Sequence, residues 1–371
     1  MKRLNDVVVL GAGIIGCAVA HELARRGARV CVIDSRDVGC GATQASAGVL
    51  APGIESNYPI LLAQLGVRSL RLYNEFIARV VEESRTEVQY VRNGALEVAV
   101  DEQSTSGLET VSARLTDLGI STEQLSGHAT REIEPELTGC VSGGLLVPEY
   151  GFVAAADLAQ AVRRAAVSHG ASFISLRTAT RILFEHGSIR IETKTDTMTA
   201  GIAVIAAGSW SSQIDVIGVP RLPVRPVRGQ LLHLEWPVSQ LQRILWSSNC
   251  YLVPWTDGSL LVGATVENVG FDERSTVAGV SELLEAVRNL VPRVRDAGFK
   301  TVRVGLRPGT PDDLPIVGAS AIVPNLMYAT GHYRTGVLLA PLTAVLVANF
   351  LLDGNLDPVL DSTSPSRFGA Y

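Results

Sequence analysis

Cysteine and positive charge are both scarce in this sequence of 371 residues. The five cysteines are odd in number, widely scattered and form no CxxC pair, which argues against a disulfide framework or a paired-thiol redox motif. We expect buried thiols in a reducing compartment. The formal net charge is −5 and no basic run occurs, so the positive surface that nucleic acids require is missing. We expect no nucleic-acid partner, and an anionic substrate must meet individually placed arginines.

Long hydrophobic runs are almost absent as well. The exception, residues 336–352, carries no charge and would form a helix of about 25 Å, slightly short for a membrane span. Because it contains Pro341 and Asn349, we predict a buried core helix and no integral membrane span. Lys2 and Arg3 precede an apolar run, as in a signal peptide, but a phosphate-binding motif occupies that run. We therefore expect a cytoplasmic protein.

The composition is that of a globular protein, and the chain is long for one compact unit. Hydrophobic residues make up 47% of the sequence and charged residues 19%. A chain of this length buries a substantial core and is expected to form two domains. No internal repeat and no low-complexity linker occurs.

A strand, a helix and a second strand open the chain. Residues 7–10 are apolar and mostly β-branched, residues 14–26 have a helical pattern that ends at Gly27, and residues 30–33 form another β run before Asp34. Because a crossover between parallel strands is almost always right-handed, this unit predicts the start of a doubly wound, Rossmann-like α/β sheet.

The remaining patterns suggest a discontinuous cofactor domain. Helical patterns cover residues 59–83, with an interruption near Gly66, and residues 104–118, 157–169 and 277–291. Strand-like runs cover residues 97–100, 172–190, 198–207 and 301–304. Antiparallel strands on a separate sheet are suggested at residues 230–235, 251–253 and 260–262. We predict an FAD-binding domain from residues 1–85, 143–218 and 302–371, and an α+β substrate domain on an antiparallel sheet from residues 86–142 and 219–301.

The glycines of GAGIIG lie directly after a strand and at the mouth of a helix. Gly11 allows the tight turn, Gly13 lets the backbone approach a pyrophosphate, and Gly16 lets helix and strand pack closely. Asp34 ends the second strand, where a carboxylate can accept hydrogen bonds from a ribose. This context predicts a cofactor that contains ADP, and it does not by itself separate FAD from NAD.

Four further segments carry a family resemblance. They are GATQASAGVLAP at residues 41–52, AAGSWSS at 206–212, GLRPGTPDDLPIVG at 305–318 and GHYRTGVLLAP at 331–341. In this order they resemble the flavin-contacting and active-site segments of the D-amino-acid oxidase superfamily, most strongly those of the glycine oxidases, which supply an imine for thiamine synthesis. The resemblance runs over nearly the whole chain and implies FAD. Because residues 307–318 contain no cysteine, the FAD is expected to be noncovalent.

The resemblance also implies which residues line the FAD site. Small residues at 43–48 would let the backbone run close to the isoalloxazine ring, Ser46 could donate to the pyrophosphate, and Ala179 would lie beside the adenine. The start of the helix after GHYRTG would face the pyrimidine edge and stabilise negative charge there. The expected FAD-binding residues are Gly11, Gly13, Ile14, Ile15, Gly16, Asp34, Ser35, Arg36, Ala42, Thr43, Ser46, Ala47, Gly48, Val49, Ala179, Ala207, Gly208, Trp210, Gly229, Arg307, His332, Tyr333, Arg334, Thr335, Gly336 and Val337. Thr335 stands where glycine oxidases commonly have asparagine, so only a backbone role is implied there.

Three side chains are candidates for holding the substrate. A guanidinium fork can grip a carboxylate with two parallel hydrogen bonds, and the resemblance places Arg307 and Tyr251 at the carboxylate of an amino acid. A structural ion pair for Arg307 and a half-buried strand position for Tyr251 are the alternatives. Arg334 is expected at the mouth of the site or on the substrate. His332 is weak evidence for a base, and the histidines show no metal-ligand spacing.

These features predict an FAD-dependent amino acid oxidase. The substrate would be glycine, sarcosine or a small D-amino acid, and oxygen would reoxidise the flavin to give hydrogen peroxide. A flavin dehydrogenase that acts on D-amino acids or 2-hydroxy acids and passes electrons to a quinone is the main alternative. A noncatalytic nucleotide-binding module, a flavin-bound RNA-modifying scaffold and an NAD-dependent dehydrogenase are further alternatives. Relatives often form dimers or tetramers, so we expect a homo-oligomer.

Overall fold

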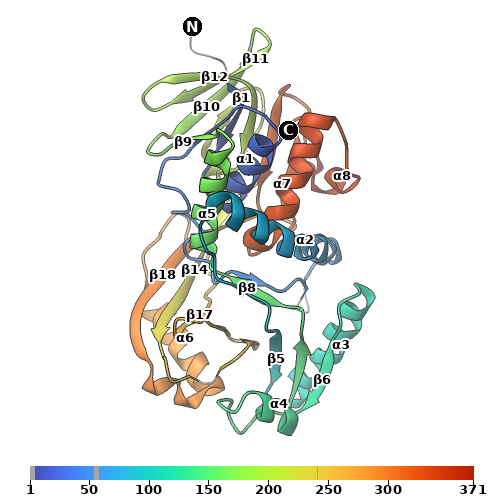
Figure 1. The fold of residues 1–371 in the computed structure, drawn as a ribbon, viewed down its shortest axis with the longest axis vertical. Coiled ribbons are helices and arrows are strands. Elements are labelled where there is room, and N and C mark those ends of the chain that lie inside the picture. The colour runs from blue at the N-terminus through green and yellow to red at the C-terminus, as the bar shows by residue number, and fades with distance from the viewer. Residues whose placement is uncertain (1–4, 54–57, 240) are drawn as a thin grey trace.

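The computed structural model describes residues 5–53, 58–239 and 241–371, and in it the strands form two large sheets and one small one. Figure 1 shows the two large sheets at opposite ends of the long axis, with helices between them. The expected fold class, an α/β cofactor unit beside a second, largely antiparallel sheet, is confirmed. Lys2 and Arg3 lie outside the described residues.

The nine-stranded sheet carries the predicted opening unit. Strand β1 pairs in parallel with β2 and with β12, and β12 pairs in parallel with β20. Parallel strands of this kind are covered on both faces, which explains why the VVVL run of β1 is apolar throughout. The strands of this sheet are β1 (Asn5–Leu10), β2 (Val30–Ile33), β9 (Ser172–Ile174), β10 (Ala179–Glu185), β11 (Ser188–Thr193), β12 (Thr197–Ile205), β13 (Asp215–Val216), β19 (Ile316–Ala319) and β20 (Leu326–Thr330).

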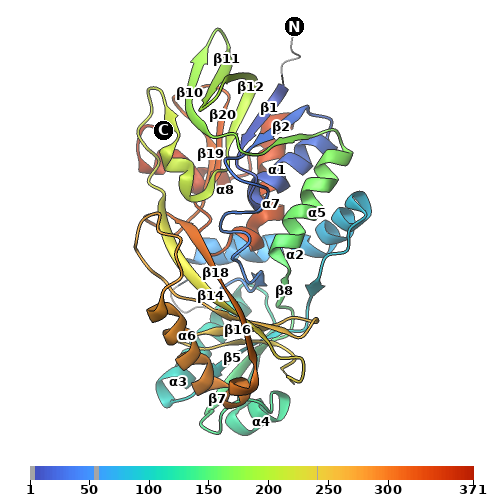
Figure 2. The same ribbon diagram turned by 90° about the vertical axis from the view of Figure 1, so that its left-hand side faces the viewer.

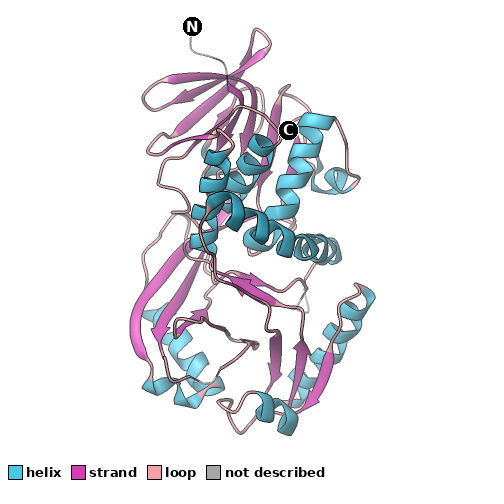
Figure 3. Cartoon of the chain, in the orientation of Figure 1, coloured by secondary structure: helices cyan, strands magenta, loops and turns pink. Residues whose placement is uncertain are grey.

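Helices gather against this sheet and toward the middle of the molecule (Figure 3). Helix α1 packs against both α5 and α7, and α2 packs against the same two helices. Their apolar faces form the largest hydrophobic core together with β1 and β2. The α-helices are α1 (Ile14–Arg25), α2 (Ile60–Ser84), α3 (Glu102–Asp117), α4 (Gly127–Ile133), α5 (Ala155–Ser168), α6 (Val277–Leu290), α7 (Gly336–Asp353) and α8 (Val359–Thr363). The 3-10 helices are η1 (Gly208–Gln213), η2 (Pro292–Asp296) and η3 (Pro365–Phe368).

The eight-stranded sheet forms the other end, and α6 covers part of it through a separate apolar core. Its strands are β5 (Ala95–Ala99), β6 (Glu123–Ser126), β7 (Gly143–Val147), β14 (Arg225–Glu235), β15 (Ile244–Trp246), β16 (Tyr251–Pro254), β17 (Ser259–Gly263) and β18 (Gly298–Gly309). A three-stranded sheet consists of β3 (Val49–Leu50), β4 (Tyr90–Val91) and β8 (Gly151–Val153). Figure 2 shows the long strands β14 and β18 running side by side toward the nine-stranded sheet.

Some local predictions were wrong. Helix α2 is continuous through Gly66, where a side chain would meet the ring of Pro52 at 2.6 Å, so the glycine serves close packing and does not interrupt the helix. The strand predicted at residues 97–100 is β5, which begins at Ala95 and ends at Ala99, and Gly94 with φ +91° separates it from β4 of another sheet. Strand β18 is longer than residues 301–304, because it pairs with β14 from Gly298 to Gly309.

Helix α7 is long and apolar enough to cross a membrane by length and composition alone. In the structure it packs against α1 and α2, and 61% of its most apolar window is buried. Ser69 and Tyr73 of α2 donate hydrogen bonds to the carbonyls of Leu338 and Val337 in its first turn. The prediction of a buried helix is confirmed, since Pro341 and its neighbours face the protein core.

Candidate functional site

One cavity of about 780 Å³ lies where the two large sheets approach each other. This volume is within the usual range for ligand and cofactor sites. Its wall includes the GAGIIG turn, residues 41–49, the start of η1, the ends of β14 and β18, and the turn before α7. Segments from the beginning, the middle and the end of the chain therefore share one site.

The GAGIIG turn forms the end of this cavity that is suited to a phosphate, which we call the phosphate end. Gly11 has φ +116°, and a Cβ there would lie 2.4 Å from the carbonyl oxygen of Ala206. A Cβ on Gly16 would lie 1.9 Å from the carbonyl oxygen of Gly11. The first turn of α1 carries no acidic residue, so the positive end of the helix is available to an anion.

Asp34 lies beside this turn at the end of β2. One carboxylate oxygen accepts a hydrogen bond from the backbone N–H of Ala12 at 2.6 Å, and the other accepts from the N–H of Arg36 at 2.8 Å. These bonds hold the carboxylate rigidly in the cavity wall. A carboxylate has further acceptor sites on each oxygen, so it remains suited to ribose hydroxyls.

A stack of side chains closes the same end. The guanidinium carbon of Arg36 lies 4.4 Å from the centre of the Trp210 ring, and Phe271 packs against that ring at 5.8 Å. Arg36 also forms an ion pair with Glu273, with N–O distances of 2.9 and 2.6 Å. Trp210 is thus a wall residue and not a core aromatic. Ala179, at the start of β10, lines the cavity too.

Residues 41–49 pass closely across the middle of the cavity. The hydroxyl of Thr43 accepts a hydrogen bond from the N–H of Ile14 at 3.1 Å, and the hydroxyl of Ser46 accepts from the N–H of Gly48. Thr43 therefore satisfies one backbone N–H group at the start of α1. A Cβ on Gly305 of β18 would lie 2.7 Å from the Cβ of Ala45, so the close approach of β18 to this loop depends on that glycine.

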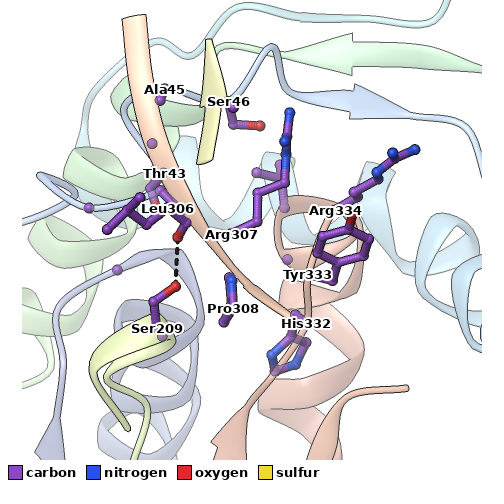
Figure 4. A pocket seen from close by; sticks show the side chains of 18 of the residues that line it. Thr43, Ala45, Ser46, Ser209, Leu306, Arg307, Pro308, His332, Tyr333 and Arg334 are labelled. Atoms are coloured by element: carbon purple, nitrogen blue, oxygen red, sulfur yellow. Dashed lines mark hydrogen bonds between the residues drawn. The ribbon is translucent and has the colours of Figure 1, made fainter. Parts of the chain in front are cut away.

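The turn before α7 forms the opposite wall. The ring of His332 is buried, and its Nε2 lies 3.0 Å from the hydroxyl of Thr343. Burial lowers the pKa of His332 to about 3, so the ring is neutral near pH 7. The Thr335 hydroxyl donates to the carbonyl of His332, which leaves its side chain inside the turn. Figure 4 shows His332 at the base of this wall, with Tyr333 and Arg334 above it.

Arg307 projects from β18 into the same cavity. Its Nη1 donates a hydrogen bond to the carbonyl of Thr265 at 2.9 Å. On the neighbouring strand a Cβ at Gly229 would lie 2.3 Å from Nη2, so the absence of a side chain there makes room for the guanidinium. In Figure 4 the side chains of Arg307 and Arg334 both extend away from His332. Arg334 lines the cavity, and its guanidinium lies 5.3 Å from the ring of Tyr333.

Tyr251 lines the cavity from β16. Its ring stacks on Trp246 with a centroid distance of 4.9 Å and an angle of 19°. It also crosses Gly263 of β17, where a Cβ would lie 2.4 Å from the phenolic oxygen. The stacking and the glycine together fix the direction of the hydroxyl.

Nearly all the expected residues therefore meet at one cavity. Gly16 and Thr335 are the two expected FAD-binding residues that do not line it. Sequence reasoning missed two residues of the wall, Trp246 and Ser209. Trp246 lies beside Tyr251. The hydroxyl of Ser209 donates to the carbonyl of Leu306 at 2.8 Å and connects η1 with β18 (Figure 4). Ser209 is part of the AAGSWSS segment at residues 206–212, whereas no sequence pattern indicated Trp246.

The wall fits an FAD molecule by its chemistry. The helix end and Asp34 suit the pyrophosphate and the ribose, and the Arg36–Trp210 stack lies beside them. The glycines at 11 and 305 keep the backbone free of side chains where a cofactor must approach. The turn before α7 presents the start of a helix to the far end.

A second group of polar side chains lies outside the cavity wall. His21, Glu83 and His169 come from the helical cover, and their ligand atoms lie within 4.8 Å of one another. Sequence spacing did not show this group, because its members are far apart in the chain. Both imidazoles are within hydrogen-bonding distance of the Glu83 carboxylate, which accounts for the grouping as a hydrogen-bond network.

Nearly the whole chain matches one protein family. Residues 6–350 match the FAD-dependent oxidoreductase (DAO) family. A bifunctional protein ThiO/ThiG from Nostoc sp. is 36% identical over 368 residues, which are 98% of this chain and 55% of that protein. The chain thus spans about half the length of this relative.

Solved structures agree with this match. The crystal structure of glycine oxidase from Geobacillus kaustophilus has a TM-score of 0.93 and 32% identity, and 98% of each chain is covered. Iminodiacetate oxidase from Chelativorans sp. has a TM-score of 0.89 and 28% identity, with 97% of this chain and 98% of that chain covered.

Proposed function

This chain belongs to the FAD-dependent oxidoreductase (DAO) family, and from that premise we propose that it oxidises the amine of a small amino acid. The substrate class is glycine, sarcosine or a small D-amino acid, and the product is the imine, which hydrolyses to the 2-oxo acid. The acceptor of the electrons is oxygen, which becomes hydrogen peroxide. The similarity to glycine oxidase over 98% of both chains supports this assignment.

The observation that carries the proposal is the position of Arg307. This guanidinium lines the same cavity as the GAGIIG turn and the turn before α7, so a carboxylate bound to it faces the cofactor site. We assign Arg307 to the substrate carboxylate, Tyr251 to a second hydrogen bond on it, and Arg334 to the mouth. The bidentate geometry of a guanidinium fixes both the position and the plane of a carboxylate.

The residues of the chain orient the substrate and do not supply a base. When bound, FAD supplies the two-electron oxidation of the amine to the imine. Arg307 and Tyr251 hold the substrate so that its α-carbon faces the cofactor, which lowers the entropic part of the barrier. His332 lines the cavity, but its ring is 3% exposed and its Nε2 is engaged with the Thr343 hydroxyl at 3.0 Å, so we do not assign it the role of a base. In a neutral substrate amine the nitrogen lone pair forms the C=N bond as hydride leaves the α-carbon, so no α-proton has to be removed by a protein base.

The wider biological assignments belong to the same proposal. The similarity to ThiO/ThiG suggests that the imine feeds thiazole synthesis for thiamine. We also propose the two-domain division given above, a homo-oligomeric assembly and a cytoplasmic location. The proposed domain boundary at residue 302 lies inside strand β18. Limited proteolysis would show whether the two domains separate there.

Anaerobic reduction tests the proposed function directly. The purified protein should be yellow, and its flavin absorbance should bleach when glycine, sarcosine or a small D-amino acid is added without oxygen. Admission of oxygen should restore the colour with one peroxide per turnover. Reduction of an artificial dye without peroxide would indicate a dehydrogenase, and no bleaching with any of these amino acids would remove the proposal.

A further inference from the structure

The segment between β17 and α6, residues 264–276, touches both ends of the cavity. We call it the strap. Thr265, near its start, contacts Arg307, and Phe271 and Glu273, further along, contact Trp210 and Arg36. Val266 of the strap lines the cavity itself. The strap therefore connects the substrate arginine with the cofactor end through one short piece of chain.

The contact with Arg307 is made by the backbone of the strap. Nη1 of Arg307 donates to the carbonyl oxygen of Thr265 at 2.9 Å. A guanidinium is planar, so anchoring one N–H restricts the directions in which its other donors can point. The position of the Thr265 carbonyl thus determines how the fork meets a carboxylate.

Thr265 is in turn held by its own side chain and by β14. Its hydroxyl accepts a hydrogen bond from the backbone N–H of Gln230 at 2.9 Å and donates to Glu267 at 2.7 Å. Its backbone N–H donates to the carbonyl of Gln230. Only 2% of Thr265 is exposed, so these bonds operate with little competition from water.

Glu267 is the point where these bonds meet. One carboxylate oxygen accepts from Gln230 at 2.8 Å and from Thr265, and the other accepts from Arg228 at 2.6 Å. Partial burial opposes ionisation, but the hydrogen bonds from Arg228, Gln230 and Thr265 outweigh it and hold the pKa of Glu267 at about 2. Arg228 is 3% exposed and also pairs with Asp272 at 3.0 Å.

We propose that Glu267 is a positioning residue for substrate binding: held by Arg228 and Gln230, it fixes Thr265 so that the Thr265 carbonyl orients the Arg307 guanidinium toward the carboxylate of the substrate. The proposal rests on the proposed function, because it assigns Arg307 to that carboxylate. Glu267 reaches the substrate only through Thr265 and Arg307. Functional groups held by such supporting hydrogen bonds lose precision when the support is removed.

The test uses the FAD-loaded protein and the substitution Glu267→Gln, which keeps the size of the side chain and removes its charge. Glycolate, which carries the carboxylate and lacks the amine, is titrated while the flavin spectrum is recorded. We expect its Kd and the KM for glycine to rise about tenfold, as for loss of a well-oriented charged hydrogen bond, while kcat changes less than about twofold. The Kd for FAD, measured by fluorescence on the apoprotein, should stay unchanged.

Two further variants separate positioning from general damage. Glu235→Gln makes the same replacement at an exposed position on β14 and should leave all values unchanged. Thr265→Val removes the hydroxyl that Glu267 holds and leaves the carbonyl, so it should raise the glycolate Kd in the same direction. Because both changes break one chain of contacts, the double variant should be no weaker than the worse single variant.

Each outcome decides the question. A glycolate Kd unchanged in Glu267→Gln, or additive losses in the double variant, would overturn the positioning role. A parallel rise in the Kd values for FAD and glycolate would also overturn it, because that pattern indicates a structural defect. If the unaltered protein binds no glycolate and is not bleached by glycine, the proposed function fails first and the positioning role falls with it.

Discussion

The two ends of the cavity are built in different ways. The main part of the phosphate end comes from one continuous stretch of chain, in which a strand, the GAGIIG turn, α1 and β2 lead directly to Asp34, and Trp210 and Phe271 complete it from elsewhere in the chain. The proposed substrate end is assembled from β14, β15, β16, β17 and β18, whose wall residues are spread over about 80 positions of the sequence. Backbone geometry dominates the first end, and side-chain placement dominates the second.

This difference shows how each end tolerates change. At the phosphate end we expect the ligand to meet backbone groups, so the essential feature is the absence of a Cβ at Gly11. At the substrate end we propose that the ligand meets Arg307 and Tyr251, so the essential features are their direction and the space beside them. Substitutions at the two ends should therefore change different binding constants.

The largest effect is expected for Gly11→Ala. The new Cβ would meet the Ala206 carbonyl, and an alanine at φ +116° is strained, so together the two penalties should reach about 4 kcal/mol, roughly a thousandfold in FAD affinity. The absorbance ratio at flavin and protein wavelengths measures the loss. Gly107→Ala in α3 is the control, because no atom lies within 4 Å of its Cβ. Full flavin content in Gly11→Ala would contradict the comparison.

Arg307→Ala should give the second largest effect, and it should change substrate binding without changing FAD binding. Removal of the guanidinium should weaken glycolate binding by about 3 kcal/mol, and the Kd for glycolate and the KM for glycine should rise roughly a hundredfold. The FAD content should stay unchanged. Arg225→Ala, an exposed position on β14, is the matched control. An unchanged KM would show that Arg307 serves the structure and not the substrate.

Gly229→Ala distinguishes two readings of one residue. The family resemblance assigns Gly229 to the cofactor, whereas the structure places its missing Cβ against the guanidinium of Arg307. We expect the added methyl group to displace Arg307 and to weaken glycolate binding about tenfold, a cost typical of overpacking. A loss of FAD with intact glycolate affinity per bound flavin would favour the cofactor reading instead.

The smallest effect concerns His332 and acid stability. Its pKa is about 3 in the folded protein and near 6.5 in an unfolded chain, so between these values the unfolded state binds more protons. Stability from this group is present above pH 6.5 and is lost as the pH falls toward 3. The Tm should therefore fall less between pH 7 and pH 5 in His332→Gln than in the unaltered protein, by about 2–4 °C.

His128→Gln is the control for this measurement. His128 is exposed on α4, so its replacement measures the effect of removing an imidazole from the surface. If His332→Gln and His128→Gln behave alike, the His332 ring is solvated and charges freely. It would then become a candidate for proton transfer at the substrate.

Much of the cofactor end could be predicted from sequence because its information is local. Any such unit must satisfy the same backbone geometry. That geometry accounts for the apolar run of β1, the spacing of the glycines and the acidic residue after β2. Arg307, the proposed substrate arginine, was identified through family resemblance, since an arginine before proline has no local pattern of its own. Trp246, Thr265 and Glu267 were missed because nothing near them in the chain indicates what they contact.

By itself the sequence determined that a strand, a glycine turn and a helix would present a phosphate-binding end, because the constraints lie within about 30 residues. It also predicted that α7 would be buried, because residues 336–352 carry no charge and include Pro341 and Asn349. Only the tertiary structure decided which strands meet at Arg307, and it placed Gly229 and the strap around that side chain. The reason is that strand pairing joins distant segments, and the position of a guanidinium depends on all of them at once.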